Sequence, residues 1–193
     1  DMAKENVHYA FSIFAKRDDK KLEELEAREE YIDYLNKEIS KYITGVLSYE
    51  NTKKGSKIFH CLYSITSNIE RIGDHAINIA EYSNMVAEKK IVFSKYAQAE
   101  LAEMQKVCDQ MLEVLLNKQD DVVKWHGLMA GMEQKIDDMT EQFRNNMYER
   151  IQKGICSDEG SILFSEMITD FERIGDHALN ISSELLKIAM VEK

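Results

Sequence analysis

Glutamate and aspartate recur four residues apart at matching places in the two halves of this chain. Two such pairs lie in a decapeptide that occurs twice, as ERIGDHAINI at residues 70–79 and as ERIGDHALNI at residues 172–181. Residues four apart on a helix are neighbours on its surface, so each copy would hold two carboxylates side by side. Like charges at that spacing destabilise a helix unless a cation lies between them. The pattern therefore predicts a binding site for a hard metal ion.

A second pair with the same spacing precedes the decapeptide in each half. Residues 29–33 read EEYID, and residues 133–137 read EQKID. Carboxylate oxygens are the ligands that hard cations prefer. We therefore expect divalent or ferric ions (iron, zinc, manganese, magnesium or calcium) as cofactors. The predicted metal ligands are Glu29, Asp33, Glu70, Asp74, Glu133, Asp137, Glu172 and Asp176.

Basic residues and imidazoles accompany the acids inside the decapeptide. Arg71 and Arg173 lie between the acids in sequence, and we expect them to pair with a carboxylate. His75 and His177 directly follow the aspartates, so their side chains are turned by about 100° away from the predicted ligands. We expect these two histidines to pack or to support the ligands rather than to bind metal.

The helical wheel and two glycines indicate where the acids lie. Glu70 and Asp74 fall roughly opposite the apolar face of their helix, which predicts a site at an outer edge or in a groove between two helices. Gly73 and Gly175 recur beside the aspartates, although a glycine inside a helix costs about 0.5–1 kcal/mol relative to alanine. Close approach of a neighbouring helix or of a bound ion would explain them.

The composition predicts an all-α fold. The chain has no proline and only eight glycines among 193 residues, and proline is the strongest helix breaker. The repeat divides the chain into two units of three helices, with a first three-helix bundle at residues 1–91 and a second at residues 92–193. We expect helices at residues 1–17, 20–50, 56–89, 95–118, 121–153 and 158–191.

Apolar residues spaced three and four apart predict a packing seam on the third helix of each unit. In the first unit the seam comprises Leu62, Ile65, Ile69, Ile72, Ala76, Ile79 and Val86, with Ser83 in the skipped place. In the second unit it comprises Phe164, Met167, Phe171, Ile174, Ala178, Ile181, Leu185 and Ile188. Helix starts are predicted from N-cap chemistry at Ser56 after Gly55, at Ser94, and at Ser157 with Asp158.

Charge and cysteine content exclude several classes of function. A formal net charge of −10 disfavours nucleic acid and anionic membrane surfaces, which bind Lys and Arg. The chain has no apolar run of about 18 residues, so we expect no membrane span. Three widely separated cysteines predict reduced thiols in the cytoplasm. The first residue is Asp1, and the first helix is shorter than the fourth; excision from a longer protein and natural asymmetry both explain this.

Together these residues resemble the PhoU family. Its hallmark is a tandem of two three-helix bundles, each with two E(D)xxxD motifs, the later one within an ERIGD-type stretch. Here the motifs stand as Glu29/Asp33 with Glu70/Asp74, and as their second-half counterparts. The resemblance covers almost the whole chain and implies multinuclear metal clusters, of iron or other divalent ions, on the bundle surface. Glu81 aligns with Ser183, so we expect the two sites to differ in ligand number.

The resemblance also implies a function. Members of the family regulate phosphate uptake and are not known as enzymes, and their partners are a phosphate transporter and its sensor kinase. Some form the cytoplasmic part of proteins related to sodium/phosphate cotransporters, and the stretch from Val92 to Leu101 resembles the link between bundles in that type. A homodimer stays open, because Tyr9, Phe11, Phe14 and Trp125 would suit a core or an interface.

Two other functions remain open from the residues alone. The first is a carboxylate-bridged di-metal enzyme, an oxidoreductase or a phosphohydrolase, although no candidate nucleophile is apparent. A ferritin-like enzyme would also need four helices around its metals, whereas each unit here has three. The second is a helical adaptor whose acids only keep it soluble, since acidic pairs on helices are most often solvated.

Overall fold

The computed structural model describes residues 1–16, 18–50 and 52–192, and it is all-α as expected. Within these ranges it contains no strand. Five of the predicted helices correspond to observed helices that begin and end within three residues of the expected bounds, and residue 17, the predicted end of the first helix, lies outside the described residues. The helices are α1 (Met2–Ala15), α2 (Asp19–Leu47), α3 (Lys53–Lys89), α4 (Lys95–Leu116), α5 (Val122–Gln152) and α6 (Asp158–Glu192).

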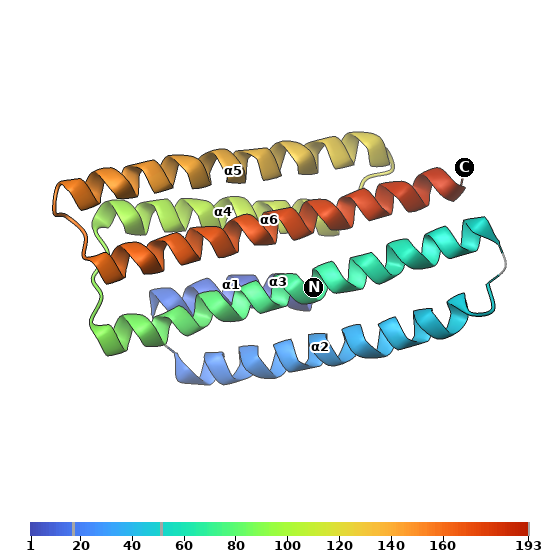
Figure 1. The fold of residues 1–193 in the computed structure, drawn as a ribbon, viewed down its shortest axis with the longest axis horizontal. Helices are drawn as coiled ribbons and strands as arrows, with labels where there is room; N and C mark the ends of the chain where they lie inside the picture. Colours follow the sequence, from blue (N-terminus) through green and yellow to red (C-terminus); the bar gives the residue numbers. More distant parts are fainter. Residues whose placement is uncertain (17, 51, 193) are drawn as a thin grey trace.

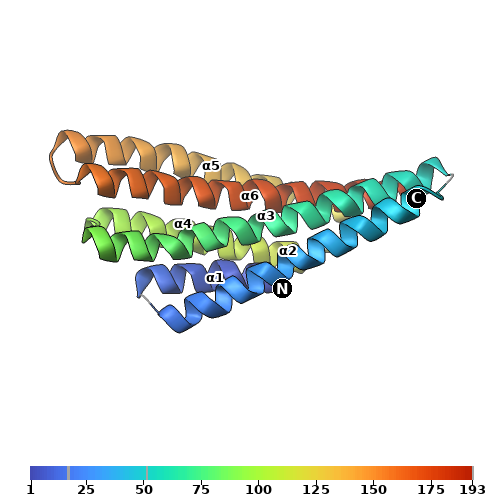
Figure 2. The ribbon, with the colours of Figure 1, turned by 60° about the horizontal axis from the view of Figure 1, so that its bottom comes forward.

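The six helices form two bundles of three that pack along their length. α1, α2 and α3 form one bundle, and α4, α5 and α6 form the other (Figure 1). The longest helices, α3 and α6, lie side by side between the bundles, and α1 also touches α4 (Figure 2). The predicted tandem of three-helix bundles is therefore confirmed, while the division between residues 91 and 92 stays a prediction.

Hydroxyl and carboxyl side chains cap the helix starts. The Ser94 hydroxyl accepts a hydrogen bond from the Ala97 amide, and Ser157 does the same for Gly160, as the sequence predicts. The prediction of Ser56 as the cap of α3 is wrong, because Thr52 accepts from the Gly55 amide and the helix already begins at Lys53. Gly55 thus lies in the first turn of α3.

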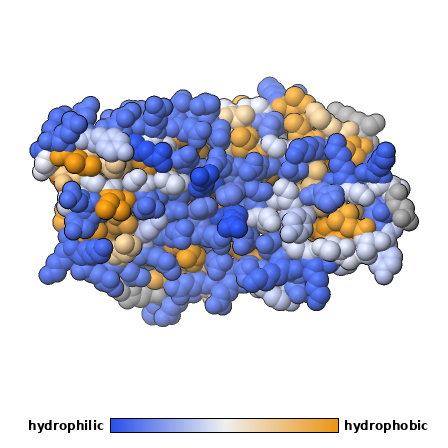
Figure 3. All heavy atoms as spheres, in the orientation of Figure 1, coloured by the Kyte–Doolittle hydropathy of each residue, from blue (hydrophilic) through white to orange (hydrophobic). Residues whose placement is uncertain are grey.

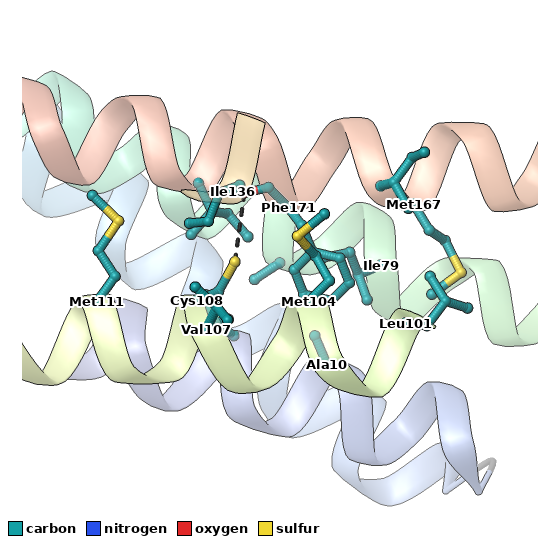
Figure 4. Packing of buried hydrophobic residues seen from close by; sticks show 14 of the residues in the cluster. Ala10, Ile79, Leu101, Met104, Val107, Cys108, Met111, Ile136, Met167 and Phe171 are labelled. Carbon is teal, nitrogen blue, oxygen red and sulfur yellow. Dashed lines mark hydrogen bonds between the residues drawn. The ribbon is translucent and has the colours of Figure 1, made fainter. Parts of the chain in front are cut away.

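The core is continuous across the two bundles (Figure 4). Trp125 is fully buried and donates its indole N–H to the Val114 carbonyl at 2.8 Å, so it belongs to the core rather than to an interface. Tyr9, Phe11 and Phe14 pack against the same cluster while remaining partly exposed. Cys108 is buried there, and burial raises its pKa, which keeps the thiol protonated. All three cysteines are free thiols.

The two predicted seams differ in burial. On α6 the seam is buried from Phe164 to Ile181, as predicted. On α3 it is buried from Ile72 to Ile79, but Leu62 and Ile69 are 37% and 38% exposed. The predicted α3 seam is therefore confirmed from Ile72 to Ile79 and is wrong at Leu62 and Ile69.

The surface is mostly hydrophilic, in keeping with the acidic composition. Hydrophilic residues cover the middle of the face shown in Figure 3, and hydrophobic residues form separate patches toward its ends. Among the described residues, no helix is both long enough and apolar enough to span a bilayer. We therefore expect the acidic pairs on the outer faces of the bundles, where the hydrophilic residues lie.

Candidate metal centre

Close packing of α2 on α3, and of α5 on α6, brings the acidic pairs of each half together. Ile32 packs over Gly73 and Ile136 over Gly175, and each of these four residues directly precedes a predicted aspartate ligand. A Cβ at Gly73 would lie 3.7 Å from Ile32 Cδ1, and one at Gly175 would lie 3.0 Å from Ile136 Cδ1. Helix packing thus accounts for Gly175, whereas a Cβ at Gly73 would make only an ordinary van der Waals contact.

The second-half acids converge on a common point. Glu133, Asp137 and Asp176 each offer a carboxylate oxygen, and these three atoms lie within 4.8 Å of one another. Burial raises the pKa of Glu133, and the neighbouring charges of Asp137, Asp176 and Glu172 raise it further. Burial and Asp176 also raise the pKa of Asp137. All four predicted ligands of this half are therefore close enough to repel one another electrostatically.

The first-half acids also face one another, but three of the four pair with protein cations. Burial raises the pKa of Glu29, with further contributions from Asp74, Asp33 and Glu70. Burial likewise raises the pKa values of Glu70 and Asp74, against the lowering effect of Arg71. Among the described residues, only the second-half group brings three carboxylate oxygens within 4.8 Å of one another.

The cations that hold the acids differ between the halves. Arg71 lies 3.7 Å from Glu70 and 3.6 Å from Asp74, which confirms its predicted pairing. Lys37, one turn after Asp33, pairs with that carboxylate, whereas the residue one turn after Asp137 is Glu141. Asp33 is therefore paired with a lysine on its own helix, whereas Asp137 has an acid in the equivalent place.

The second half has its own pairings on the α6 side. Arg173 lies 3.1 Å from Asp176, as predicted, and Arg144 lies 3.3 Å from Glu172. Among the described residues, Glu133 and Asp137 form no ion pair with a protein cation, and in the first half the same holds for Glu29. Across the part of the chain that the structure describes, α5 is thus the one helix whose Glu-x-x-x-Asp pair has no protein cation at either acid.

The arrangement suits a hard cation. Every predicted ligand is half-buried at the outer edge where two helices meet, so the placement expected from the helical wheel is confirmed. Three oxygens within 4.8 Å of one another share a centre no more than about 2.8 Å from each, so small side-chain shifts would bring all three to the Ca²⁺–oxygen distances of about 2.3–2.6 Å. A bound cation would also offset the mutual repulsion that raises the pKa values of these carboxylates.

Asp170 was not predicted from the sequence, but it organises the interface behind the acids. It is buried and accepts hydrogen bonds from His75 at 2.7 Å, Asn78 at 3.2 Å and Tyr82 at 2.7 Å. Burial and this carboxylate raise the pKa of Tyr82, which keeps its hydroxyl as a donor. His75 therefore packs between the bundles, as expected, and not at the acids.

His177 makes the corresponding contact in the other direction. Its Nδ1 lies 2.9 Å from Asn68 Oδ1, and Asn68 precedes Asp170 by 102 residues, which is the separation of the repeat. His177 is thus related to His75 as Asn68 is to Asp170. Each partner lies seven residues upstream of the histidine of its own half: Asn68 before His75, and Asp170 before His177. An alignment of the two repeats would therefore have placed the two partners at equivalent positions.

Two further acidic residues do not join the clusters. Glu81 is exposed on α3, and its second-half neighbour Glu184 pairs with Lys187 at 2.8 Å beside Cys61. The expected difference in ligand number therefore does not arise from these positions.

The chain also holds one Glu-x-x-His sequence, Glu5 to His8, but Glu5 pairs with Arg28 on a different face.

Comparison with known proteins agrees with this architecture. The family model described as "PhoU domain" matches residues 1–83 and 101–185, one match in each half of the chain. A curated protein of Thermotoga maritima, "Phosphate-specific transport system accessory protein PhoU homolog 1", is 29% identical over 166 residues. The alignment covers 83% of this chain and 69% of that protein.

Two solved structures share the fold. The crystal structure of PhoU from Pseudomonas aeruginosa superposes with a TM-score of 0.86 at 15% identity, covering 98% of this chain and 90% of that one. The phosphate transport system regulatory protein PhoU from Streptococcus pneumoniae gives a TM-score of 0.82 at 20% identity, covering 97% and 87%. At these identities the similarity establishes the arrangement of helices.

Proposed function

The chain belongs to the PhoU family, and on that premise we propose that it regulates phosphate transport through metal ions bound at its acidic clusters. The observation that carries the metal part of the proposal is the convergence of Glu133, Asp137 and Asp176 on one point. A solvated acidic face would spread its charges apart, whereas here the packing of α5 on α6 holds them together. The regulatory part rests on the family and on its curated relative.

The second-half cluster is proposed as the stronger site. Glu133 and Asp137 on α5, with Glu172 and Asp176 on α6, would hold the ion through oxygen atoms alone, and Glu29, Asp33, Glu70 and Asp74 would form the first-half site. Divalent or ferric ions fit such ligands, with iron, manganese, magnesium, calcium and zinc as candidates. A bound cation would supply positive charge on the surface of a protein whose formal net charge is −10.

The proposed partner is a phosphate transporter or its sensor kinase. The curated relative is named as an accessory protein of a phosphate-specific transport system, which supports a partner of this class. A cytoplasmic location, a homodimer and membership of a protein related to sodium/phosphate cotransporters stay predictions. The proposed role is regulatory rather than catalytic.

Metal titration tests the binding step. We expect the metal-free protein to bind Mn²⁺ in isothermal titration calorimetry, and the double variant Glu133→Gln, Asp137→Asn to lose the tighter of two sites. The matched control, Asp138→Asn with Glu149→Gln, removes the same charge from exposed positions on the same helix. Equal weakening in both double variants would show that only net charge matters and would contradict the proposal.

Phosphate uptake tests the regulatory step separately. Cells that lack the gene and carry either the wild-type chain or the Glu133→Gln, Asp137→Asn variant should differ in their uptake of radiolabelled phosphate. Uptake that does not respond to deletion of the gene would contradict the regulatory role. Metal-dependent turnover of peroxide or of a phosphate ester by the purified protein would instead favour the di-metal enzyme.

A further inference from the structure

Three exposed tyrosines lie on one side of α2, and a fourth follows directly after its end. The first three are spaced three and eight residues apart, which keeps them together on a helix surface at about 100° per residue. α2 runs along the outer edge of the first bundle (Figures 1 and 2). We call the four residues the tyrosine stripe; they are Tyr31, Tyr34, Tyr42 and Tyr49, which are 49%, 55%, 71% and 85% exposed.

The second bundle shows that exposure of this side belongs to the repeat and that the tyrosines do not. The residues at the equivalent positions of α5 and its C-terminal end are exposed or half-buried, although α4 packs beside α5 there. None of them is aromatic; they are Lys135, Asp138, Asn146 and Lys153. Tyrosine is enriched in protein interfaces, because its ring is large and apolar while its hydroxyl can stay hydrated. The tyrosine stripe therefore indicates a protein contact that only the first bundle makes.

The stripe has a ridge near one end and a hollow near the other. Tyr31 and Tyr34 form the ridge, with their rings stacked at 6.2 Å between centroids and 22° between planes. An open hollow of about 470 Å³ lies over Gly45, between Tyr42 and Tyr49. A Cβ at Gly45 would meet no described atom within 4 Å, so packing inside the chain does not require a glycine there. Close approach of another molecule would explain this glycine, which weakens the helix relative to alanine.

The ridge of one copy fits the hollow of another when two α2 helices pack antiparallel around a twofold axis. Placing Tyr34 over Gly45 of the second copy puts this axis between residues 39 and 40. The same axis brings Glu38 opposite Lys41 of the second copy, and Lys41 opposite Glu38. Both side chains are exposed, and neither forms an ion pair within the described part of the chain. The charges therefore agree with a register that the ridge and the hollow alone define.

The exposed area also suits a contact between two copies. With about 200 Å² for a tyrosine side chain, the four tyrosines expose roughly 500 Å² in each copy. Two copies thus bring together roughly 1,000 Å², which is the lower limit for a specific interface, and Glu38 and Lys41 add to it. An interface of this size fits a weak dimer that dissociates on dilution.

We propose that two copies of this chain dimerise through the tyrosine stripe, with their α2 helices antiparallel. Tyr34 of each copy fills the hollow over Gly45 of the other, and two Glu38–Lys41 pairs fix the register. The predicted metal ligands of α2 lie on the opposite side of that helix, so both acidic clusters stay accessible. The inference therefore does not depend on the proposed function.

An exchange of charges tests the register. Glu38→Lys and Lys41→Glu each place like charges across both pairs, and we expect each single variant to weaken the dimer by about tenfold or more. The double variant, Glu38→Lys with Lys41→Glu, restores opposite charges and should dimerise like the wild type. Sedimentation velocity over a wide range of protein concentrations measures all four chains. The single variants change the net charge in opposite directions, so an effect of net charge cannot weaken both.

Gly45→Gln tests the hollow. The new side chain fills the space that Tyr34 of the second copy takes, so the dimer should again weaken by about tenfold or more. The monomer should keep its fold, because a Cβ at Gly45 meets no described atom within 4 Å; far-UV circular dichroism checks this. Gly127→Gln on α5 is the matched control, since a Cβ there has the same open space. It should dimerise like the wild type.

Each outcome decides the question. Weakened dimers in both single charge variants and in Gly45→Gln, with recovery in the charge exchange, would support the proposed contact. A wild-type chain that stays monomeric at every concentration would overturn it and would leave the tyrosine stripe to a different protein. A dimer that persists in the single variants would lie on another face and would overturn the proposal as well. Equal weakening by Gly127→Gln would do the same.

Discussion

The imidazole rings of His75 and His177 stack at 5.5 Å between centroids and 22° between planes, so the two halves meet through the same residue of the repeat. Burial, together with the neighbouring His75, lowers the pKa of His177 to about 4. A neutral His177 can stack on its counterpart without charge repulsion. Because each histidine follows a predicted aspartate ligand, this contact joins the two clusters across the α3–α6 interface.

Asp170 should contribute strongly to this interface. Asp170→Ala removes the acceptor of His75, Asn78 and Tyr82 in a buried place, and we expect a loss of about 2–4 kcal/mol in the free energy of unfolding. Asp170→Asn copies the residue that the first half has at Asn68 and should cost less. Urea denaturation measures both, and equal losses would show that packing rather than hydrogen bonding matters here.

The two decapeptide glycines should respond differently to alanine. Gly73→Ala places its Cβ 3.7 Å from Ile32, an ordinary contact, so better helix propensity should stabilise the protein by about 0.5–1 kcal/mol. Gly175→Ala places its Cβ 3.0 Å from Ile136 Cδ1, so the buried isoleucine must shift and the gain should be reduced or reversed. Thermal denaturation of the two variants compares these effects.

A second substitution shows whether the contact is the cause. Ile136→Val removes the Cδ1 atom, so Gly175→Ala should be less harmful, or more stabilising, in the Ile136→Val background than in the wild type. Ile32→Val should have no such effect on Gly73→Ala. If the effects of Ile136→Val and Gly175→Ala on stability are additive, the 3.0 Å approach of the alanine Cβ to Ile136 Cδ1 costs no free energy in the alanine variant.

The sequence was sufficient for the fold and for the acidic pairs because both follow from local patterns. Helical periodicity and the absence of proline predict six helices, and the repeated Glu-x-x-x-Asp pairs predict which faces carry the acids. The four-residue spacing is geometry within one helix. The agreement between the two copies of ERIGDHAxNI then extends the prediction to pairs of helices.

Contacts between distant segments were not predictable in the same way. Asp170 looks like an ordinary acid in sequence, and only packing of α3 on α6 places it against His75 and Tyr82. The exposure of Ile69 was missed because periodicity shows which face is apolar, not whether another helix covers it. The start of α3 was misplaced because Ser56 and Thr52 offer the same capping chemistry four residues apart.

The carboxylate clusters should make the metal-free protein sensitive to pH. A carboxylate whose pKa is raised by folding binds its proton more tightly in the folded state, so its ionisation lowers stability as pH rises. Asp137→Asn removes one such charge, and we expect a higher Tm by about 1–2 °C at pH 7 in EDTA, a small gain because the group is largely solvated. The gain should vanish below the ordinary pKa of 3.8.

Melting curves from pH 3.5 to pH 8 check this expectation. Asp138→Asn, on the neighbouring exposed position, provides the control, because Asp138 lies outside the convergent oxygens. Adding Mn²⁺ should reverse the order of the wild type and Asp137→Asn at pH 7, since the variant has lost a ligand. A stability difference that is independent of pH would contradict the repulsion inferred from the raised pKa values.

Lys37 should be the residue that weakens the first-half site. It pairs with Asp33, and its counterpart in the second half is Glu141, so Lys37→Glu removes a competing cation and restores the second-half pattern. In a background of Asp137→Asn with Asp176→Asn, we expect Lys37→Glu to tighten Mn²⁺ binding by about three- to tenfold. Calorimetry measures the affinity of the remaining first-half site.

A control of equal charge separates pairing from net charge. Lys41→Glu makes the same change one turn further along α2, where the side chain is exposed and forms no ion pair with the acids among the described residues. It should tighten Mn²⁺ binding far less than Lys37→Glu, and Lys37→Gln should fall between them. Equal gains in affinity from Lys37→Glu and Lys41→Glu would mean that long-range charge, rather than the Asp33–Lys37 pair, causes the difference in Mn²⁺ affinity between the two halves.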